Sequence, residues 1–179
     1  RITRIVELIT ELNSWSNGQS FLEKEYEPVK IDQLLNDTVT AFQLKLTEQF
    51  ADKQIALDEA TISANQDGLK QVFSNLLQNI LDYNVGSSLS IRGQKVQDIY
   101  HIELSHTGQR INPDKKEKIF ERFYRLEESR STKAEGAGLG LAIAKSIIHA
   151  HQGKIGLTTD GTHHTFWVEL PILTNNAEF

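Results

Sequence analysis

A glycine-rich turn ahead of an apolar helix is the segment of this sequence best suited to chemistry. Glycine occupies every second position in residues 136–141 (GAGLGL), which lead straight into the apolar-periodic segment 142–151. Such a backbone can turn tightly and aim several N–H groups at one point, and the positive end of the following helix also attracts an anion. A phosphate chain is the simplest such anion. Alone the motif is weak, because glycine-rich turns also serve only to start helices.

Polar residues recur every fourth position along a second predicted helix, which runs from Asp67 to Tyr83. Asn75, Asn79 and Tyr83 therefore share one stripe beside the apolar face of this helix. Amide oxygens on one helix face suit a magnesium ion that keeps several waters and is otherwise held by substrate phosphates. The alternative is an ordinary solvated face, and the stripe alone favours that alternative.

A third segment combines aromatic and basic residues. Residues 119–125 (IFERFYR) precede a mostly polar stretch, 126–135, that contains Arg130 and Lys133. Phe120 and Phe123, three positions apart, would anchor a short helix to the core. The polar stretch would then be a mobile cover that brings positive side chains to phosphates. On spacing alone, a solvated loop is an equally good interpretation.

The elements that must position these segments are predicted from periodicity. We expect helices after Pro28, capped by Asp32, and after Asp67, capped by that residue, and a further helix start at Asn112-Pro113. Alternating patterns predict strands over 54–57, 61–64, 89–92, 99–104, 154–158 and 165–170. Tyr100, Ile102 and Leu104 would face inward on one strand, and Phe166, Val168 and Leu170 on another. The expected fold is α+β, with a mixed, largely antiparallel sheet covered by helices on one face.

The N-terminal residues form a pattern of their own. Apolar residues at Ile2, Ile5, Ile9 and Leu12 make a narrow seam typical of a helical bundle or coiled coil. A single such helix is marginal alone, so it needs partners from another part of the protein or from a second copy. A helix lying on its own domain is the alternative. Because the chain starts at Arg1, inside a helical pattern, we expect it to be a fragment of something longer.

Composition excludes several classes of function. A formal net charge of −5 over 179 residues argues against a nucleic-acid binder, which usually carries a basic excess. The absence of cysteine excludes disulfides and thiolate metal sites. No apolar run approaches the roughly 20 residues that span a bilayer, and no signal peptide is visible.

Taken together and in this order, the segments resemble the sensor histidine kinases of two-component systems, within the Bergerat-type ATPase superfamily. Residues 71–79 look like the N box, 119–125 match the F box, and 136–141 form a complete second glycine box. The resemblance covers nearly the whole chain and implies a Bergerat-type sandwich preceded by a bundle helix. It divides the chain into a second dimerisation helix (1–18), a linker (19–27), an ATP-binding catalytic domain (28–173) and a tail (174–179).

The resemblance also implies cofactors and site residues, with ATP and Mg²⁺ as the ligands. Asn79 would be the magnesium ligand, and Asn75 would support the metal and phosphates, with Arg125 meeting the phosphates as a second catalytic residue. The residues implied to contact the nucleotide are Asn75, Asn79, Tyr83, His106, Gly108, Arg125, Arg130, Lys133, Gly136, Gly138, Leu139, Gly140 and Leu141.

By the same resemblance, the γ-phosphoryl group would pass to a histidine on the dimerisation domain and then to an aspartate of a response regulator receiver domain. The chain would form a homodimer through its N-terminal helix and work in the cytoplasm, with a membrane-tethered parent protein. A rival interpretation is a pseudokinase-like module that binds ATP weakly or not at all and acts through partner contacts or regulator dephosphorylation. Another Bergerat ATPase, such as a chaperone or topoisomerase fragment, is disfavoured by the bundle helix and the F box.

Three positions depart from the family pattern. His106 stands where an aspartate usually accepts a hydrogen bond from the adenine amino group. A neutral imidazole can accept one such bond and a protonated one cannot, and losing a charged acceptor costs about 1.5–3 kcal/mol. Arg110 replaces a glycine and adds bulk or positive charge near the nucleotide. Asp82 stands where many relatives carry a phosphate-binding lysine and would repel the nucleotide unless it faces away or joins the metal shell.

The histidines do not supply the phosphoacceptor. None of the six is followed by an acidic residue and a nearby proline, as the family's acceptor is, so we expect that acceptor upstream of Arg1. His149 with His151, or His163 with His164, could form a metal pair. Because no third ligand is evident, surface or helix-end histidines are the favoured interpretation.

Overall fold

A five-stranded sheet forms the centre of the fold. The computed structural model describes residues 3, 6–7, 9–10, 25–124 and 138–174. Its central sheet has the order β2-β4-β5-β7-β6, in which β2 and β4 are parallel and the other neighbours antiparallel. These strands are β2 (Asp52–Leu57), β4 (Asn84–Val96), β5 (Ile99–Gly108), β6 (Lys154–Thr159) and β7 (His163–Pro171). A separate antiparallel pair joins β1 (Glu27–Lys30) to β3 (Thr61–Ala64).

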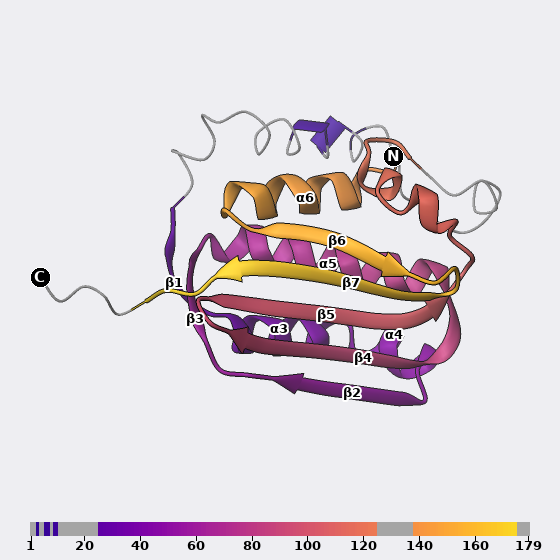
Figure 1. Ribbon diagram of the computed structural model, residues 1–179, viewed down its shortest axis with the longest axis horizontal. Coiled ribbons are helices and arrows are strands. Elements are labelled where there is room, and N and C mark those ends of the chain that lie inside the picture. Colours follow the sequence, from indigo (N-terminus) through magenta and orange to yellow (C-terminus); the bar gives the residue numbers. More distant parts are fainter. Residues whose placement is uncertain (1–2, 4–5, 8, 11–24, 125–137, 175–179) are drawn as a thin grey trace, which may run out of the picture.

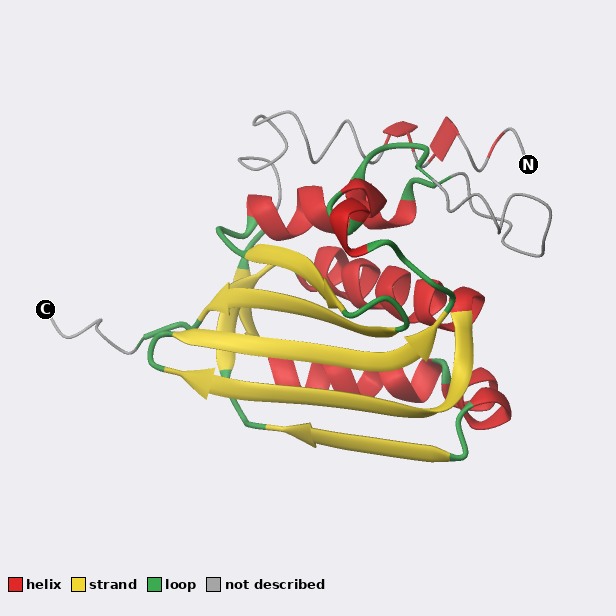
Figure 2. Cartoon of the chain, turned by 45° about the vertical axis from the view of Figure 1, so that its right-hand side comes forward, coloured by secondary structure: helices red, strands yellow, loops and turns green. Residues whose placement is uncertain are grey.

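Helices cover one face of the central sheet. They are α3 (Ile31–Ala41), α4 (Gln43–Gln49), α5 (Gln66–Tyr83) and α6 (Gly140–Ala150), with single 3₁₀ turns at η1 (Pro113–Lys115) and η2 (Lys118–Phe120). In Figures 1 and 2 the helices lie on one side of the strands, and no described element covers the opposite face. The α+β sandwich predicted from the sequence is confirmed.

The core forms between the inward face of the sheet and the apolar stripes of the helices. Burial alternates along β5 and β7, as their period of two requires. The predicted inward residues of both strands are buried, and so is the predicted stripe of α5: Tyr100, Ile102, Leu104, Phe166, Val168, Leu170, Leu69, Val72, Phe73, Leu76, Leu77 and Ile80. This packing fixes which face of α5 meets the sheet. The polar stripe of α5 therefore lies beside the buried face and not within the core.

Two of the helix caps differ from those predicted. Asn65, not Asp67, caps α5: its side chain accepts a hydrogen bond from the Gly68 N–H at 2.8 Å, and its backbone is extended. Asp67 lies in the first turn instead. Asp32 likewise lies inside α3, which begins at Ile31 without a side-chain cap, and its Oδ1 accepts a hydrogen bond from the Ala60 N–H at 3.4 Å.

Most of the predicted N-terminal seam lies outside the described residues. Of its four apolar residues only Ile9 is described, and it is partly buried against the hydrophobic core. The dimerisation helix and the predicted domain boundaries therefore stay predictions. In the described part of the chain, every helix is too short or too polar to cross a membrane.

Candidate functional site

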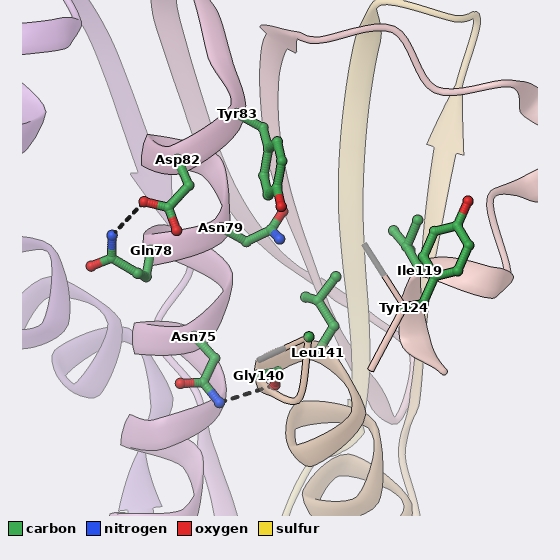
Figure 3. A pocket seen from close by; sticks show the side chains of 10 residues that line it. Asn75, Gln78, Asn79, Asp82, Tyr83, Ile119, Tyr124, Gly140 and Leu141 are labelled. Carbon is green, nitrogen blue, oxygen red and sulfur yellow. Dashed lines mark hydrogen bonds between the residues drawn. The ribbon is translucent and has the colours of Figure 1, made fainter. Parts of the chain in front are cut away.

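A cleft opens between the polar stripe of α5 and the glycine-led start of α6. Its outer chamber, of about 140 Å³, is shown in Figure 3, with α5 on one side, Ile119 and Tyr124 on the other, and Leu141 below. The residues that line it are Asn75, Gln78, Asn79, Asp82, Tyr83, Ile119, Tyr124, Gly138, Gly140 and Leu141. The fold thus brings the asparagine stripe and the glycine turn to one cavity.

Asn75 joins the two elements directly. Its Nδ2 donates a hydrogen bond to the Gly140 carbonyl at 3.0 Å, which fixes the start of α6 against α5. One helical turn further on, the Asn79 side chain extends into the cleft, which Tyr83 also lines. Asn79 therefore presents an amide group to the space in front of the glycine turn.

Asp82 lines the mouth of the cleft without entering its interior. The residue is exposed, and its Oδ1 accepts a hydrogen bond from Gln78 Nε2 at 2.8 Å, one turn earlier on α5. Figure 3 shows this pair on the outer side of the helix. The carboxylate still places a negative charge at the entrance.

Gly138 meets a steric requirement that no other residue can meet easily. Its φ is +74°, and an added Cβ would lie 2.7 Å from both the Phe123 carbonyl carbon and the Tyr124 carbonyl oxygen. The Phe123 N–H donates to the Gly138 carbonyl at 3.0 Å. Tyr124 and Gly138, which flank residues 125–137, therefore lie close together. Arg125, Arg130, Lys133 and Gly136 fall in that segment, outside the described residues, so their implied roles stay predictions.

Only one of the two phenylalanines of this region is an anchor. Phe120 is buried and packs edge-on against Phe166, with ring centroids 6.4 Å apart. Phe123 is 57% exposed, so the prediction that both rings anchor the segment is wrong. The predicted helix is a single 3₁₀ turn, and Phe123 has a φ of +65°, outside the helical range. Ile119 and Tyr124, neither of which was predicted to be a site residue, line the cleft instead.

An inner chamber of about 40 Å³ continues from the cleft toward the sheet. Its walls are mostly apolar or aromatic, with two imidazoles and one amide: Asn79, Tyr83, His106, Ile111, Ile119, Tyr124, Leu141, His164 and Phe166. Apolar walls with a few placed polar groups are typical of sites for flat heteroaromatic rings.

His106 lies on β5 directly opposite His164 on β7, and both are 2% exposed. Their rings meet edge to face at 5.6 Å. His106 Nδ1 lies 3.2 Å from Asn84 Oδ1. Burial, reinforced by the neighbouring His164 and His163, lowers the pKa of His106 to about 4, so its ring is neutral at pH 7.

The burial of His164 corrects the prediction that it lies on the surface. Its Nε2–H donates to the Gln109 carbonyl at 2.7 Å, and its Nδ1 accepts from the Thr159 hydroxyl at 2.7 Å. The signal was present in the sequence, because His164 lies two positions before the inward-facing Phe166. His151 is a helix-end residue, as predicted, but it is buried at the C-cap of α6 and accepts the Asn65 N–H at 3.0 Å. Within the described ranges, no three His, Cys, Asp or Glu side chains form a metal cluster.

Gly108 and Arg110, which follow His106, are both accommodated locally. A Cβ on Gly108 would lie within 2.9 Å of His106 Cε1, His164 Cδ2 and the Tyr83 carbonyl, so glycine permits these groups to converge. Arg110 lines neither chamber. Its guanidinium lies over Gly161, in the turn between β6 and β7, so its bulk stays out of the cleft.

Comparison with known proteins places this geometry in context. Residues 64–174 match the family described as histidine kinase-, DNA gyrase B-, and HSP90-like ATPase. The sensor protein VanS of Enterococcus faecium is 43% identical over 119 residues, which cover 66% of this chain and 31% of that protein. The chain spans about a third of the length of the curated relatives it matches.

Solved structures show the same fold. A nucleotide-free catalytic domain of histidine kinase ThkA is 27% identical, with a TM-score of 0.70 over 82% of this chain and 95% of that chain. Full-length ShkA in complex with AMPPNP is 22% identical, with a TM-score of 0.74 over 97% of this chain and 37% of that chain.

Proposed function

Because the chain belongs to the family of histidine kinase-, DNA gyrase B- and HSP90-like ATPases and is the catalytic ATPase domain of a sensor histidine kinase, we propose that its cleft holds the magnesium complex of ATP. One observation carries this proposal: the asparagine stripe of α5 and the glycine turn before α6 face each other across a cavity that continues into an apolar chamber. The outer chamber has polar groups for phosphates, and the inner one has walls for a base.

The phosphates would lie against the backbone of residues 138–141. Gly138, Gly140 and Leu141 line the cleft, and the first turn of α6, which begins at Gly140, favours negative charge. Gly136 would extend this cradle, and Arg125, with Arg130 and Lys133, would supply positive charge from the segment between the F box and the glycine turn. Adenine would enter the inner chamber, against Leu141 and beside Tyr83 and His106.

The residues of the outer chamber fit a magnesium ion. Mg²⁺ prefers oxygen ligands, keeps several waters and takes few ligands from the protein when phosphates supply the rest. Asn79 offers one amide oxygen in the cleft, and Asn75, which is bound to Gly140, would support the metal and phosphates. When bound, the ion would neutralise charge on the phosphates.

The domain would position the γ-phosphoryl group for transfer to a histidine of the dimerisation domain, upstream of Arg1. Such transfer depends mainly on alignment and charge neutralisation, which the residues of the cleft are placed to supply. We infer that the phosphoryl group then passes to an aspartate of a response regulator receiver domain. We further infer a homodimer through the N-terminal helix and action in the cytoplasm as part of a membrane-tethered parent protein.

Calorimetric titration with Mg-ATP tests the proposal. The unaltered chain should bind, Asn79→Ala should bind more weakly in the presence of Mg²⁺, and the exposed control Asn36→Ala should match the unaltered chain. Absence of binding until His106→Asp restores a carboxylate would instead support the pseudokinase interpretation, which the comparisons do not support. Adding the upstream dimerisation helix and measuring radiolabel transfer from ATP would then test phosphotransfer.

A further inference from the structure

Asn84 forms a fixed contact behind the inner chamber. It is the residue at which α5 ends and β4 begins. Its Nδ2 donates to the Gly86 carbonyl at 2.7 Å, and a carbonyl oxygen can only accept. The amide orientation is therefore determined, and the Asn84 atom that faces His106 is the acceptor Oδ1.

This orientation determines where the proton of His106 lies. Because Asn84 Oδ1 cannot donate, His106 Nδ1 must carry the hydrogen of their 3.2 Å contact. The ring is neutral at pH 7, so it has only one N–H and its Nε2 keeps a bare lone pair.

The lone pair of Nε2 is available to a ligand. Within the described residues, Nε2 has no hydrogen-bond partner. It is nevertheless accessible, because fully buried side-chain atoms without a partner form a separate set to which Nε2 does not belong. His106 lines the inner chamber, so a ligand in that chamber can reach its ring. His164 does not compete, because its only N–H is donated to the Gln109 carbonyl.

We propose that Asn84 is a positioning residue that holds His106 in the Nδ1–H tautomer, so that Nε2 accepts a hydrogen bond from the 6-amino group of adenine. This inference rests on the proposed function and adds the basis of its base specificity. In a purine with oxygen at position 6, the lone pairs of that oxygen would face the lone pair of Nε2, and the two acceptors would repel each other. Binding it would require a proton on Nε2, and therefore loss of the contact between His106 Nδ1 and Asn84.

The tautomer is measurable without any nucleotide. In the chain labelled with ¹⁵N-histidine, imidazole nitrogen shifts and two-bond couplings to the ring protons at pH 7 should show His106 protonated at Nδ1 and bare at Nε2. Asn84→Leu should release this preference, and Asn84→Asp, which keeps an acceptor, should retain it. A proton on Nε2 in the unaltered chain overturns the inference, whether or not ATP binds.

Nucleotide analogues test the consequence. The unaltered chain should bind Mg-ATP about two- to tenfold more tightly than the magnesium complex of purine riboside triphosphate, which lacks the 6-amino group. Asn84→Leu should lose this preference, while Asn84→Asp and the exposed control Asn36→Leu should keep it. An unchanged preference in Asn84→Leu overturns the inference. If Asn84→Leu does not fold, the inference is overturned when Asn84→Asp or the unaltered chain shows no preference for Mg-ATP. A chain with the expected tautomer that binds neither nucleotide contradicts the proposed function and leaves the Asn84 contact established.

Discussion

The buried, neutral His106 makes the stability of this domain depend on pH in a defined window. Burial lowers the pKa of His106 to about 4, whereas a histidine in the unfolded chain titrates near its ordinary value of 6.5. Between these two values the unfolded chain binds more protons than the folded one. The free energy of unfolding therefore falls as the pH is lowered from about 6.5 toward about 4.

The size of the effect follows from the same two values. A pKa that falls from 6.5 to about 4 corresponds to about 3 kcal/mol of unfolding free energy. About 2 kcal/mol of this is lost between pH 7 and pH 5. Burial also lowers the pKa of His164, which lies across the strand pair, and of His151, so both add to the loss in the same direction.

Urea unfolding at pH 7 and pH 5 isolates the share of His106. In the variant His106→Gln, residue 106 is uncharged at either pH. Between pH 7 and pH 5 the free energy of unfolding of the unaltered chain should therefore fall by about 2 kcal/mol more than that of this variant. The control His101→Gln removes a histidine from the uncovered face of the sheet and keeps His106, so the loss should remain. Equal losses in the unaltered chain and in His106→Gln would refute the reasoning.

Three further experiments test other parts of the structure. Gly138→Ala should lower the free energy of unfolding by about 1–2 kcal/mol from its positive φ alone and weaken Mg-ATP binding, whereas Gly140→Ala, whose Cβ would lie 3.8 Å from its nearest neighbour, should change stability little. Asn65→Ala should cost about 1 kcal/mol in urea unfolding because α5 loses its cap, and a similar cost for Asp67→Ala would contradict this assignment. Asn79→Ala should abolish the dependence of ATP affinity on Mg²⁺ concentration, and unchanged dependence would exclude Asn79 as the ligand.

Sequence periodicity predicted the core elements because their burial is set locally. The apolar stripe of α5 and the alternation in β5 and β7 each appear within one segment, and all three are buried as expected. The caps were harder to predict, because Asn65 and Asp67 are both suitable residues only two positions apart. The full extent of β4 was also missed. Its first residues, Asn84 to Ser88, show no alternation. Asn84 pairs with Gly108 of β5 and Ser88 with Asp52 of β2, and the register with β5 shifts between Asn84 and Leu89.

The candidate site was predictable only in outline. Motif order brought together the α5 stripe and the glycine turn, because each is continuous in the sequence. The contact between Asn84 and His106 joins residues 22 positions apart and has no local signal, so it required the fold. His164 differs, because strict alternation from Phe166 places it on the inward face, and a count of two along the strand would have found it.

Each departure from the family motif is accommodated by a contact with a neighbouring residue. Asp82 is bonded to Gln78 on its own helix, Arg110 lies over the turn at Gly161, and His106 is oriented by Asn84. An adenine amino group requires an acceptor at one position, and a neutral imidazole with a fixed tautomer provides one as a carboxylate does. What the imidazole lacks is the negative charge, so recognition should be weaker by the difference between a charged and a neutral acceptor, about 1 kcal/mol. A degenerate glycine box in the sequence is therefore compatible with an intact base pocket, provided that Gly108 still lets the two imidazoles and the Tyr83 carbonyl converge.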